Sequence, residues 1–216
     1  MTPRPAFAPW DVRTAPRILP SDESARRVRI FAAVEARLAT ALEAFAGVID
    51  VDHAKGILAR HAKRHAWHSF LFQNALEDAA GSTPTDSSIE DTDIAAIVDA
   101  VLAPDGVERT IEFLTGVYRV LLPRQITAYT YFVRALGGDA ADADERWFDF
   151  VLQDAYASIR DGELLLQSLL AGPDEVQRSA DRRAELEAMF VIAGGLVGPD
   201  SLGALTATTR SKENAR

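Results

Sequence analysis

The feature that most constrains the fold is the spacing of the apolar residues, which recur at steps of three and four along most of the chain. The first long stretch carries apolar side chains at Val28, Phe31, Val34, Leu38, Leu42 and Phe45. Residues at these steps lie on one face of an α-helix, whereas a half-buried strand needs strict alternation of apolar and polar residues. No alternating stretch occurs in the sequence. We therefore expect an all-α protein.

Interruptions of this pattern divide the chain into separate helices. Ser21 and the acidic residues after it are typical of a helix start, and glycines follow most of the helices. The predicted helices cover about residues 21–45, 51–80, 93–102, 107–136, 142–170 and 174–192. Four long helices in two pairs predict an antiparallel four-helix bundle with short additional helices. Pro123 falls inside the third long helix and predicts a kink there.

The same pattern predicts one domain with extended termini. Residues 1–20 contain five prolines and are expected to form an extended N-terminal arm. The helical bundle is expected at residues 21–195, with a polar, turn-rich loop at residues 82–93. Residues 196–216 lack a helical pattern near their end and are expected to form a flexible C-terminal tail.

The composition excludes several classes of function. The chain has no cysteine, which excludes disulfides, thiolate catalysis and iron–sulfur clusters. No apolar run approaches the roughly 18 residues that a membrane span requires, and the first residues do not resemble a secretory signal. We therefore expect a cytoplasmic protein without a membrane partner. The net charge of −9 argues against a nucleic-acid partner.

All four histidines lie in the second long helix, and three of them share a face with its apolar residues. At about 100° per residue, His61, His65 and His68 fall within an arc of roughly 60°. Leu58 and Phe72 project from the same side of the helix, so these three histidines are expected to face the interior. Spacings of three and four residues bring two imidazoles close enough to bind one metal ion.

Residues on other helices complete the candidate site. Glu35 flanks the apolar stripe of the first helix, and Asp154 flanks that of the fourth long helix. Tyr118 and Tyr129 are inward-facing groups of the third long helix, expected beside the ligands as hydrogen-bond donors or as radical-accessible side chains. The candidate metal ligands are Glu35, His61, His65, His68 and Asp154.

This ligand set departs from that of a di-iron helical bundle. Such a centre takes a glutamate from each of two helices and a Glu-x-x-His motif from each of the other two. Here the second helix carries His65-Ala-Trp-His68, without the glutamate, and the fourth long helix has no histidine. Two interpretations remain open. The residues hold a mononuclear metal site with two histidines and one or two carboxylates, or they form a buried, metal-free cluster of hydrogen-bonded side chains.

Three parts of the chain resemble uncharacterised ferritin-like proteins of actinobacteria. They are residues 29–37 with 58–68, residues 116–124 with Ala128-Tyr129, and residues 151–163. The resemblance covers about residues 22–171 and implies a ferritin-like bundle. It places Glu35 at the ligand position of the first helix and His65 and His68 at the pair of the second helix. Asp154 is the nearest match on the fourth long helix, and the third has no match.

The resemblance leads to a first functional hypothesis, a ferritin-like protein that binds iron or another transition metal between its helices, with a redox role. The alternative is a metal-free helical protein without a cofactor, which binds a small ligand or a partner subunit. In that case the histidines form a structural cluster. A homodimer is compatible with either hypothesis.

Two further groups of residues are interpreted as structural. Aromatic residues at helical spacing are expected in the core, and they are Trp67, Trp147, Phe148 and Phe150. The basic cluster of Arg60, Lys63 and Arg64 is interpreted as a solvated surface.

Overall fold

The computed structural model describes residues 19, 21–80, 92–103, 106–135 and 141–197, and the regular structure of these residues is entirely helical. The helices are α1 (Ser21–Val48), α2 (Asp52–Ala80), α3 (Thr92–Leu102), α4 (Thr110–Leu114), α5 (Leu122–Ala135), α6 (Ala141–Leu169) and α7 (Pro173–Ala193). A short 3₁₀ turn, η1 (Val107–Arg109), precedes α4, and a π-helical segment, η2 (Thr115–Leu121), joins α4 to α5. The expected all-α class is confirmed for the described residues.

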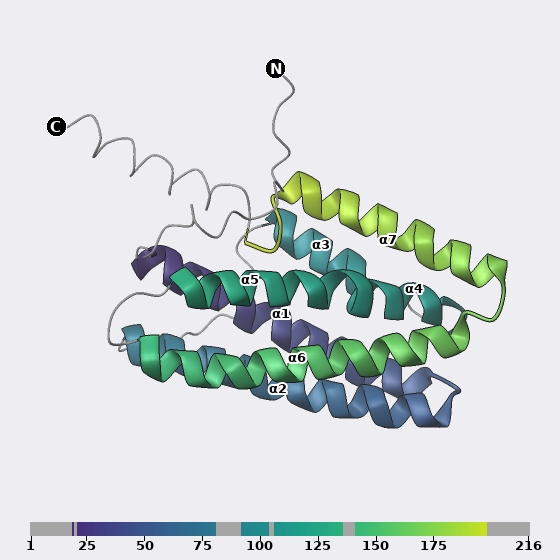
Figure 1. Ribbon diagram of the computed structural model, residues 1–216, viewed down its shortest axis with the longest axis horizontal. Helices are drawn as coiled ribbons and strands as arrows, with labels where there is room; N and C mark the ends of the chain where they lie inside the picture. The colour runs from purple at the N-terminus through teal and green to yellow at the C-terminus, as the bar shows by residue number, and fades with distance from the viewer. Residues whose placement is uncertain (1–18, 20, 81–91, 104–105, 136–140, 198–216) are drawn as a thin grey trace, which may run out of the picture.

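The long helices lie lengthwise beside one another, as Figure 1 shows. Helix α1 packs along α2, α5 packs on α6, and α3 and α7 cover the side of the molecule formed by η2. The apolar core has two clusters. One lies around Phe31, Phe72 and Phe132, and the other includes Leu38 and Leu58. Both clusters contain residues of α1 and α2, and along α2 the buried His65 and His68 lie between the residues of the two clusters.

Most of the predicted helix ends lie within three residues of the observed ones. Two residues from the predicted termini belong to the core. Leu19 is buried and donates its backbone N–H to the carbonyl of Ala135, and Leu196 is buried after α7. The remainder of the predicted arm at 1–20, most of the loop at 82–93 and residues 198–216 of the predicted tail lie outside the described residues.

The predicted continuous helix at residues 107–136 is divided into four segments. The π-helical segment η2 ends at Leu121, two residues before Pro123, and Leu122 donates its N–H to the carbonyl of Val117, five residues back. Proline has no N–H to donate, and its ring clashes with the preceding helical turn. The disturbance expected at Pro123 is observed as this widened turn before it. It is also a local feature that often marks a functional part of a helix.

The expectation that the aromatic residues lie in the core is only partly correct. Phe148 is buried and Trp147 is half-buried, but Trp67 and Phe150 are 44% and 58% exposed. Trp67 directly precedes His68 in α2, and one residue turns a helix by about 100°. Since His68 faces the core, the indole of Trp67 is directed away from it.

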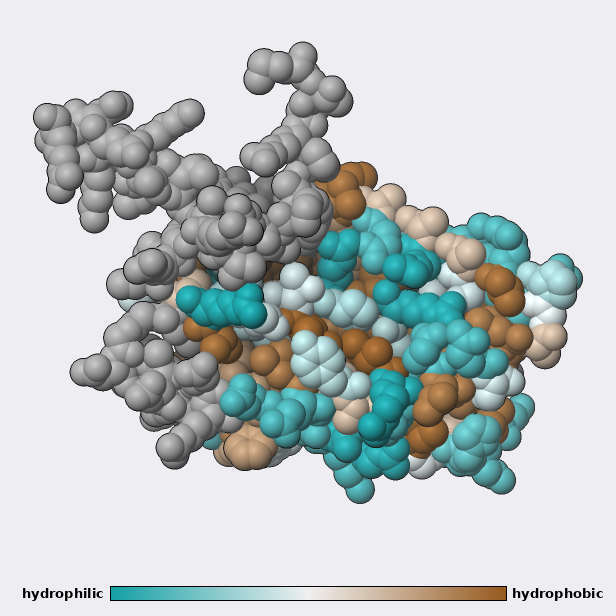
Figure 2. Space-filling model, viewed as in Figure 1, coloured by the Kyte–Doolittle hydropathy of each residue, from teal (hydrophilic) through white to brown (hydrophobic). Residues whose placement is uncertain are grey.

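On the face drawn in Figure 2, hydrophilic and hydrophobic side chains are interspersed, and neither kind forms an extended patch among the coloured residues. Among the described helices, none combines the length and the apolar character that a membrane crossing requires.

The contact between α6 and η2 leads to a first prediction. A Cβ atom at Gly162 would lie 2.3 Å from ring atoms of Tyr118, so we expect Gly162→Ala to lower the free energy of unfolding by about 1–3 kcal/mol or more. Gly56, in the exposed part of α2, has open space around it. The matched variant Gly56→Ala should instead raise the free energy of unfolding by about 0.5–1 kcal/mol. Denaturant titration measures both, and equal effects of the two variants would contradict the prediction.

Candidate metal centre

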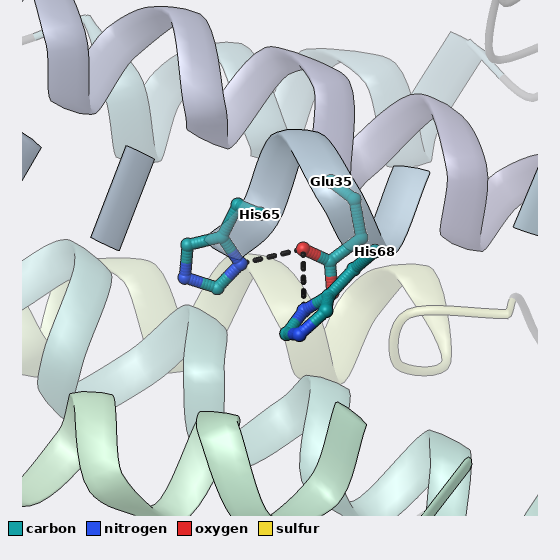
Figure 3. A group of neighbouring side chains, drawn as sticks. All are labelled: Glu35, His65 and His68. Carbon is teal, nitrogen blue, oxygen red and sulfur yellow. Dashed lines mark hydrogen bonds and ion pairs between the residues drawn. The ribbon is translucent and has the colours of Figure 1, made fainter. Parts of the chain in front are cut away.

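Three buried side chains from two helices meet at the boundary between the core clusters. Glu35 comes from α1, and His65 and His68 come from α2. Glu35 is 1% exposed and both histidines are fully buried. Because α1 and α2 pack closely along their length, an inward position on one helix faces inward positions on the other. Figure 3 shows both imidazoles directed at the same oxygen of Glu35.

The distances in this group are short. His65 Nδ1 lies 2.5 Å from Glu35 Oε2, and His68 Nδ1 lies 3.6 Å from the same oxygen. The three candidate ligand atoms lie within 4.8 Å of one another. In the part of the chain that the structure describes, no other set of three or more acidic, histidine or cysteine side chains is close enough to hold a metal ion.

The second oxygen of Glu35 is fixed by α5. Tyr129 donates its phenolic O–H to Oε1 at 2.6 Å, and Gln125 donates a side-chain N–H to the same atom at 3.1 Å. Burial alone would raise the pKa of Glu35, but the adjacent His65 and His68 lower it far below its usual range. The carboxylate therefore keeps its negative charge in the interior, with Oε2 directed at the histidines.

His68 connects this group to Asp154, which is partly exposed to solvent. Its Nε2 lies 3.3 Å from Oδ2 of Asp154 on α6, and the other oxygen of Asp154 lies 3.4 Å from Nε of Arg64. Burial would lower the pKa of His68, but the Glu35 and Asp154 carboxylates raise it above its ordinary value. Asp154 is 30% exposed, so the polar chain from Glu35 reaches solvent between α2 and α6.

His68 Nδ1 faces a carboxylate oxygen without a hydrogen bond to it. It is buried and has no hydrogen-bond partner, and at 3.6 Å its contact with Glu35 Oε2 is too long for a hydrogen bond. When Nε2–H donates to Asp154, the neutral ring directs a lone pair from Nδ1 at a carboxylate oxygen. Two electron-rich atoms facing each other in a dry interior repel, unless a proton or another cation lies between them.

The structure places the predicted ligand His61 apart from this group. His61 is fully buried one turn earlier on α2, and its Nδ1 is hydrogen-bonded to the hydroxyl of Tyr118 at 2.8 Å. Its Nε2 lies 3.7 Å from Oδ2 of Asp161. Burial, together with His65, Arg64 and Arg60, lowers the pKa of His61 to about 4, although Asp161 opposes the shift. His61 is thus a neutral imidazole at physiological pH.

The two predicted tyrosines have different neighbours. Tyr129 contacts the ligand Glu35 directly, as expected, whereas Tyr118 contacts only His61 among the predicted site residues. The predicted Asp154 contacts His68 through the nitrogen that faces away from Glu35.

Two polar residues near the site, Gln125 and Asp161, are not among the predicted site residues. Gln125 was recognisable as an inward polar group of the third long helix, although its contact with Glu35 was not. Asp161 follows Asp154 by seven residues, which is about two helical turns. His61 precedes His68 by the same interval. Matching intervals on two adjacent helices are the sequence signal that pairs the two acids with the two histidines.

Comparisons of the chain with models of known protein families, with curated protein sequences and with solved structures find no significant match.

The contact of α5 with Glu35 leads to a second prediction. Tyr129→Phe removes the shortest hydrogen bond to Oε1 and leaves a buried charge less well compensated. We expect the free energy of unfolding to fall by about 2 kcal/mol, the usual contribution of a hydrogen bond to a charged group. Tyr156 is 58% exposed, and Tyr156→Phe should change stability by less than about 0.5 kcal/mol. Denaturant titration of both variants checks this, and a neutral Tyr129→Phe would contradict it.

A third prediction concerns pH. The folded pKa of His61 is lowered from 6.5 to about 4, so the unfolded chain binds the proton first as the pH falls. The contribution of a neutral His61 to the free energy of unfolding is complete above about pH 6.5. It declines between pH 6.5 and 4 and levels off at lower pH. The stability difference between the wild type and His61→Gln should therefore shrink by on the order of 2–3 kcal/mol from pH 7 to pH 4. A difference that stays constant or grows would contradict this.

Proposed function

We propose that this chain is a ferritin-like helical-bundle protein that binds a transition-metal ion, foremost ferrous iron, at Glu35, His65 and His68, and that the ion serves a redox role. The observation that carries the proposal is the buried Nδ1 of His68, which lacks a hydrogen-bond partner and faces the Glu35 carboxylate. Two imidazoles with one carboxylate, leaving other coordination positions open, form the ligand set typical of mononuclear non-haem iron.

The separations of the ligand atoms fit an ion of this size. Bonds of about 2.1 Å to nitrogen and oxygen place two ligand atoms of one ion roughly 3.0–3.4 Å apart in tetrahedral or octahedral geometry. The separation between His68 Nδ1 and Glu35 Oε2 is 3.6 Å, and that between His65 Nδ1 and the same oxygen is 2.5 Å. All three ligand atoms lie within 4.8 Å of one another, so shifts of the side chains would bring them to these separations, and binding would release the proton shared by His65 and Glu35.

The surrounding residues support the ligands. Tyr129 and Gln125 hold Oε1 of Glu35, which directs Oε2 at the ion. Asp154 accepts a hydrogen bond from Nε2 of His68, the outer carboxylate that orients a metal-bound histidine and raises its basicity. His65 Nε2 is buried without such a partner. When bound, a ferrous ion supplies one-electron redox chemistry. Because all three ligands are buried, the oxidant that reaches them must be small.

The ferritin-like part of the proposal is supported by the origin of these groups. Residues from α1, α2, α5 and α6 converge on one point of the interior, and these helices lie side by side (Figure 1). Ligand sites of four-helix bundles are built in this way from facing helices. The small-molecule partner, the homodimer and the cytoplasmic location expected from the sequence stay predictions.

A second candidate is a metal-free helical protein, and one observation favours it. The hydrogen bond of 2.5 Å between His65 and Glu35 already compensates part of the buried negative charge. A proton on His68, favoured by its raised pKa, would then occupy the space between Nδ1 and Glu35. In this case the cluster specifies packing, and the chain acts through a small ligand or a partner subunit.

The proposal predicts a metal content that depends on two histidines. Purified, untagged protein, before and after aerobic loading with ferrous iron, should contain close to one equivalent of iron or manganese by plasma mass spectrometry. The double variant His65→Ala, His68→Ala should contain none. The matched control is His53→Ala, an exposed histidine of the same helix, which should keep the wild-type metal content. Asp154→Asn should weaken metal affinity about 10–100-fold, the usual effect of losing an outer carboxylate.

The absence of metal from the wild type under both conditions would refute the proposal. If the double variant then loses stability, the histidines form the structural cluster of the second candidate. Circular dichroism of each variant establishes that it is folded before its metal content is compared.

A further inference from the structure

Tyr118 and His61 form a second buried polar pair, which the proposed metal centre does not use. Tyr118 is 1% exposed, His61 is fully buried, and the phenolic oxygen lies 2.8 Å from Nδ1 of His61. The π-helical segment η2 carries Tyr118, and its ring lies against Gly162 of α6, where any side chain would collide with it. A rare helix type and a glycine in tight contact thus both fix one phenol against one imidazole.

The surroundings of His61 determine the direction of this hydrogen bond. Nε2 of His61 lies 3.7 Å from the carboxylate of Asp161, and a negative charge on that side favours the tautomer with its proton on Nε2. Nδ1 then carries the lone pair. The phenol of Tyr118 is therefore the donor, and the imidazole is already placed to accept its proton.

Asp161 connects the pair to solvent. Its side chain is 21% exposed and accepts a hydrogen bond of 3.1 Å from Arg60, which is half exposed. A proton that arrives at Nδ1 of His61 makes an imidazolium, whose Nε2–H faces this carboxylate. Tyr118, His61 and Asp161 therefore lie in a row from a fully buried hydroxyl to the surface, with a hydrogen bond between the first two and a separation of 3.7 Å between His61 Nε2 and Asp161 Oδ2.

We propose that Tyr118 is a redox-active tyrosine that gives one electron to a one-electron oxidant while its phenolic proton passes to His61. The O–H bond of Tyr118 breaks, an N–H bond forms at Nδ1 of His61, and the oxidant gains one electron. The products are a neutral tyrosyl radical and an imidazolium that faces Asp161. Reduction by one electron returns the proton to the phenol, so the cycle leaves the protein unchanged.

Burial makes this coupling necessary. A phenol that lost its electron alone would leave a positive charge in the interior, and one that lost its proton alone would leave a negative charge. The pKa of Tyr118 is raised far above its ordinary value, first by burial and then by Asp161. Tyr118 therefore cannot act as a phenolate. Joint loss of the electron and the proton leaves the phenol neutral and moves the positive charge to His61, beside a carboxylate.

Tyr129 has a weaker proton acceptor, although its hydroxyl is also hydrogen-bonded. Its partner Glu35 receives a second donor from Gln125, and its charge is directed at His65 and His68. These contacts already engage both oxygens of Glu35 and leave it a weaker proton acceptor than His61, whose Nδ1 has the hydroxyl of Tyr118 as its hydrogen-bond partner. Of the two buried tyrosines, Tyr118 is therefore the one whose oxidation is coupled to a suitable proton acceptor.

The inference goes beyond the proposed metal centre. A bound ion can supply the oxidant, since His65 follows His61 by one turn, about 6 Å along the axis of α2. The coupling of Tyr118 to His61 does not require the ion, because an oxidant from solution serves equally. An experiment on metal-free protein therefore tests the tyrosine alone, and its failure would leave the metal proposal standing.

The experiment is flash photolysis of chelator-treated, full-length protein with tris(bipyridyl)ruthenium and a sacrificial electron acceptor as the photo-oxidant. The tyrosyl radical is followed by its absorption and by electron paramagnetic resonance. The chain has four tyrosines, so single phenylalanine variants can assign the signal. A long-lived neutral radical is expected in the wild type and in Tyr156→Phe, and is expected to be lost in Tyr118→Phe. A radical that survives in Tyr118→Phe overturns the inference.

The role of His61 is tested separately. His61→Phe should form the Tyr118 radical roughly 100-fold more slowly, since a positioned proton acceptor contributes a factor of this order. An unchanged rate overturns the coupling. Should this variant not fold, the wild type decides the question through the solvent deuterium isotope effect on radical formation. A slower reaction in deuterium oxide supports the coupled transfer, and equal rates in the two solvents overturn it.

Discussion

One buried negative charge, that of Glu35, imposes conditions on every helix around it. An uncompensated carboxylate in a protein interior costs several kcal/mol, and Glu35 is almost fully buried. Its two oxygens are therefore shared between α2, which supplies His65 and His68, and α5, which supplies Gln125 and Tyr129. These partners hold the helices in one register, because sliding either helix by a single turn would leave the charge unpaired.

The sequence predicts much of this arrangement, and the reason is periodicity. Helical spacing is a property of single segments, so the helix ends and the inward direction of His61, His65 and His68 followed without a structure. For Glu35 it gave only a position on the flank of the apolar face. The pairing of side chains between helices is different, because it depends on the relative axial positions of the helices, which no single segment contains. For this reason His61 was grouped with His65 and His68, although it belongs with Tyr118 and Asp161.

Other features escaped prediction because they depend on local alternatives of similar energy. Pro123 indicated a disturbance of its helix, but whether the backbone kinks or widens depends on what packs against the preceding turn. The aromatic side chains of Trp67 and Phe150 are exposed although they recur at a helical interval. The interval between two aromatic residues does not show which face of the helix is buried. For Trp67 the neighbouring residues show it, since His65 and His68 occupy the inner face.

The π-helical segment η2 has a consequence for how the chain tolerates changes in length. A widened turn holds about one residue more than the same rise of α-helix, so deleting one residue within 115–121 would let an ordinary α-helix form there. The shortened helix would fill the same rise, so α5 would keep its rotation relative to α4, whereas the same deletion in a regular α-helix would turn everything beyond it by about 100°. Tyr129 lies beyond this segment, so its hydroxyl would stay directed at Glu35. Tyr118 lies within the segment, so the hydroxyl that faces His61 is the one that a single deletion would displace.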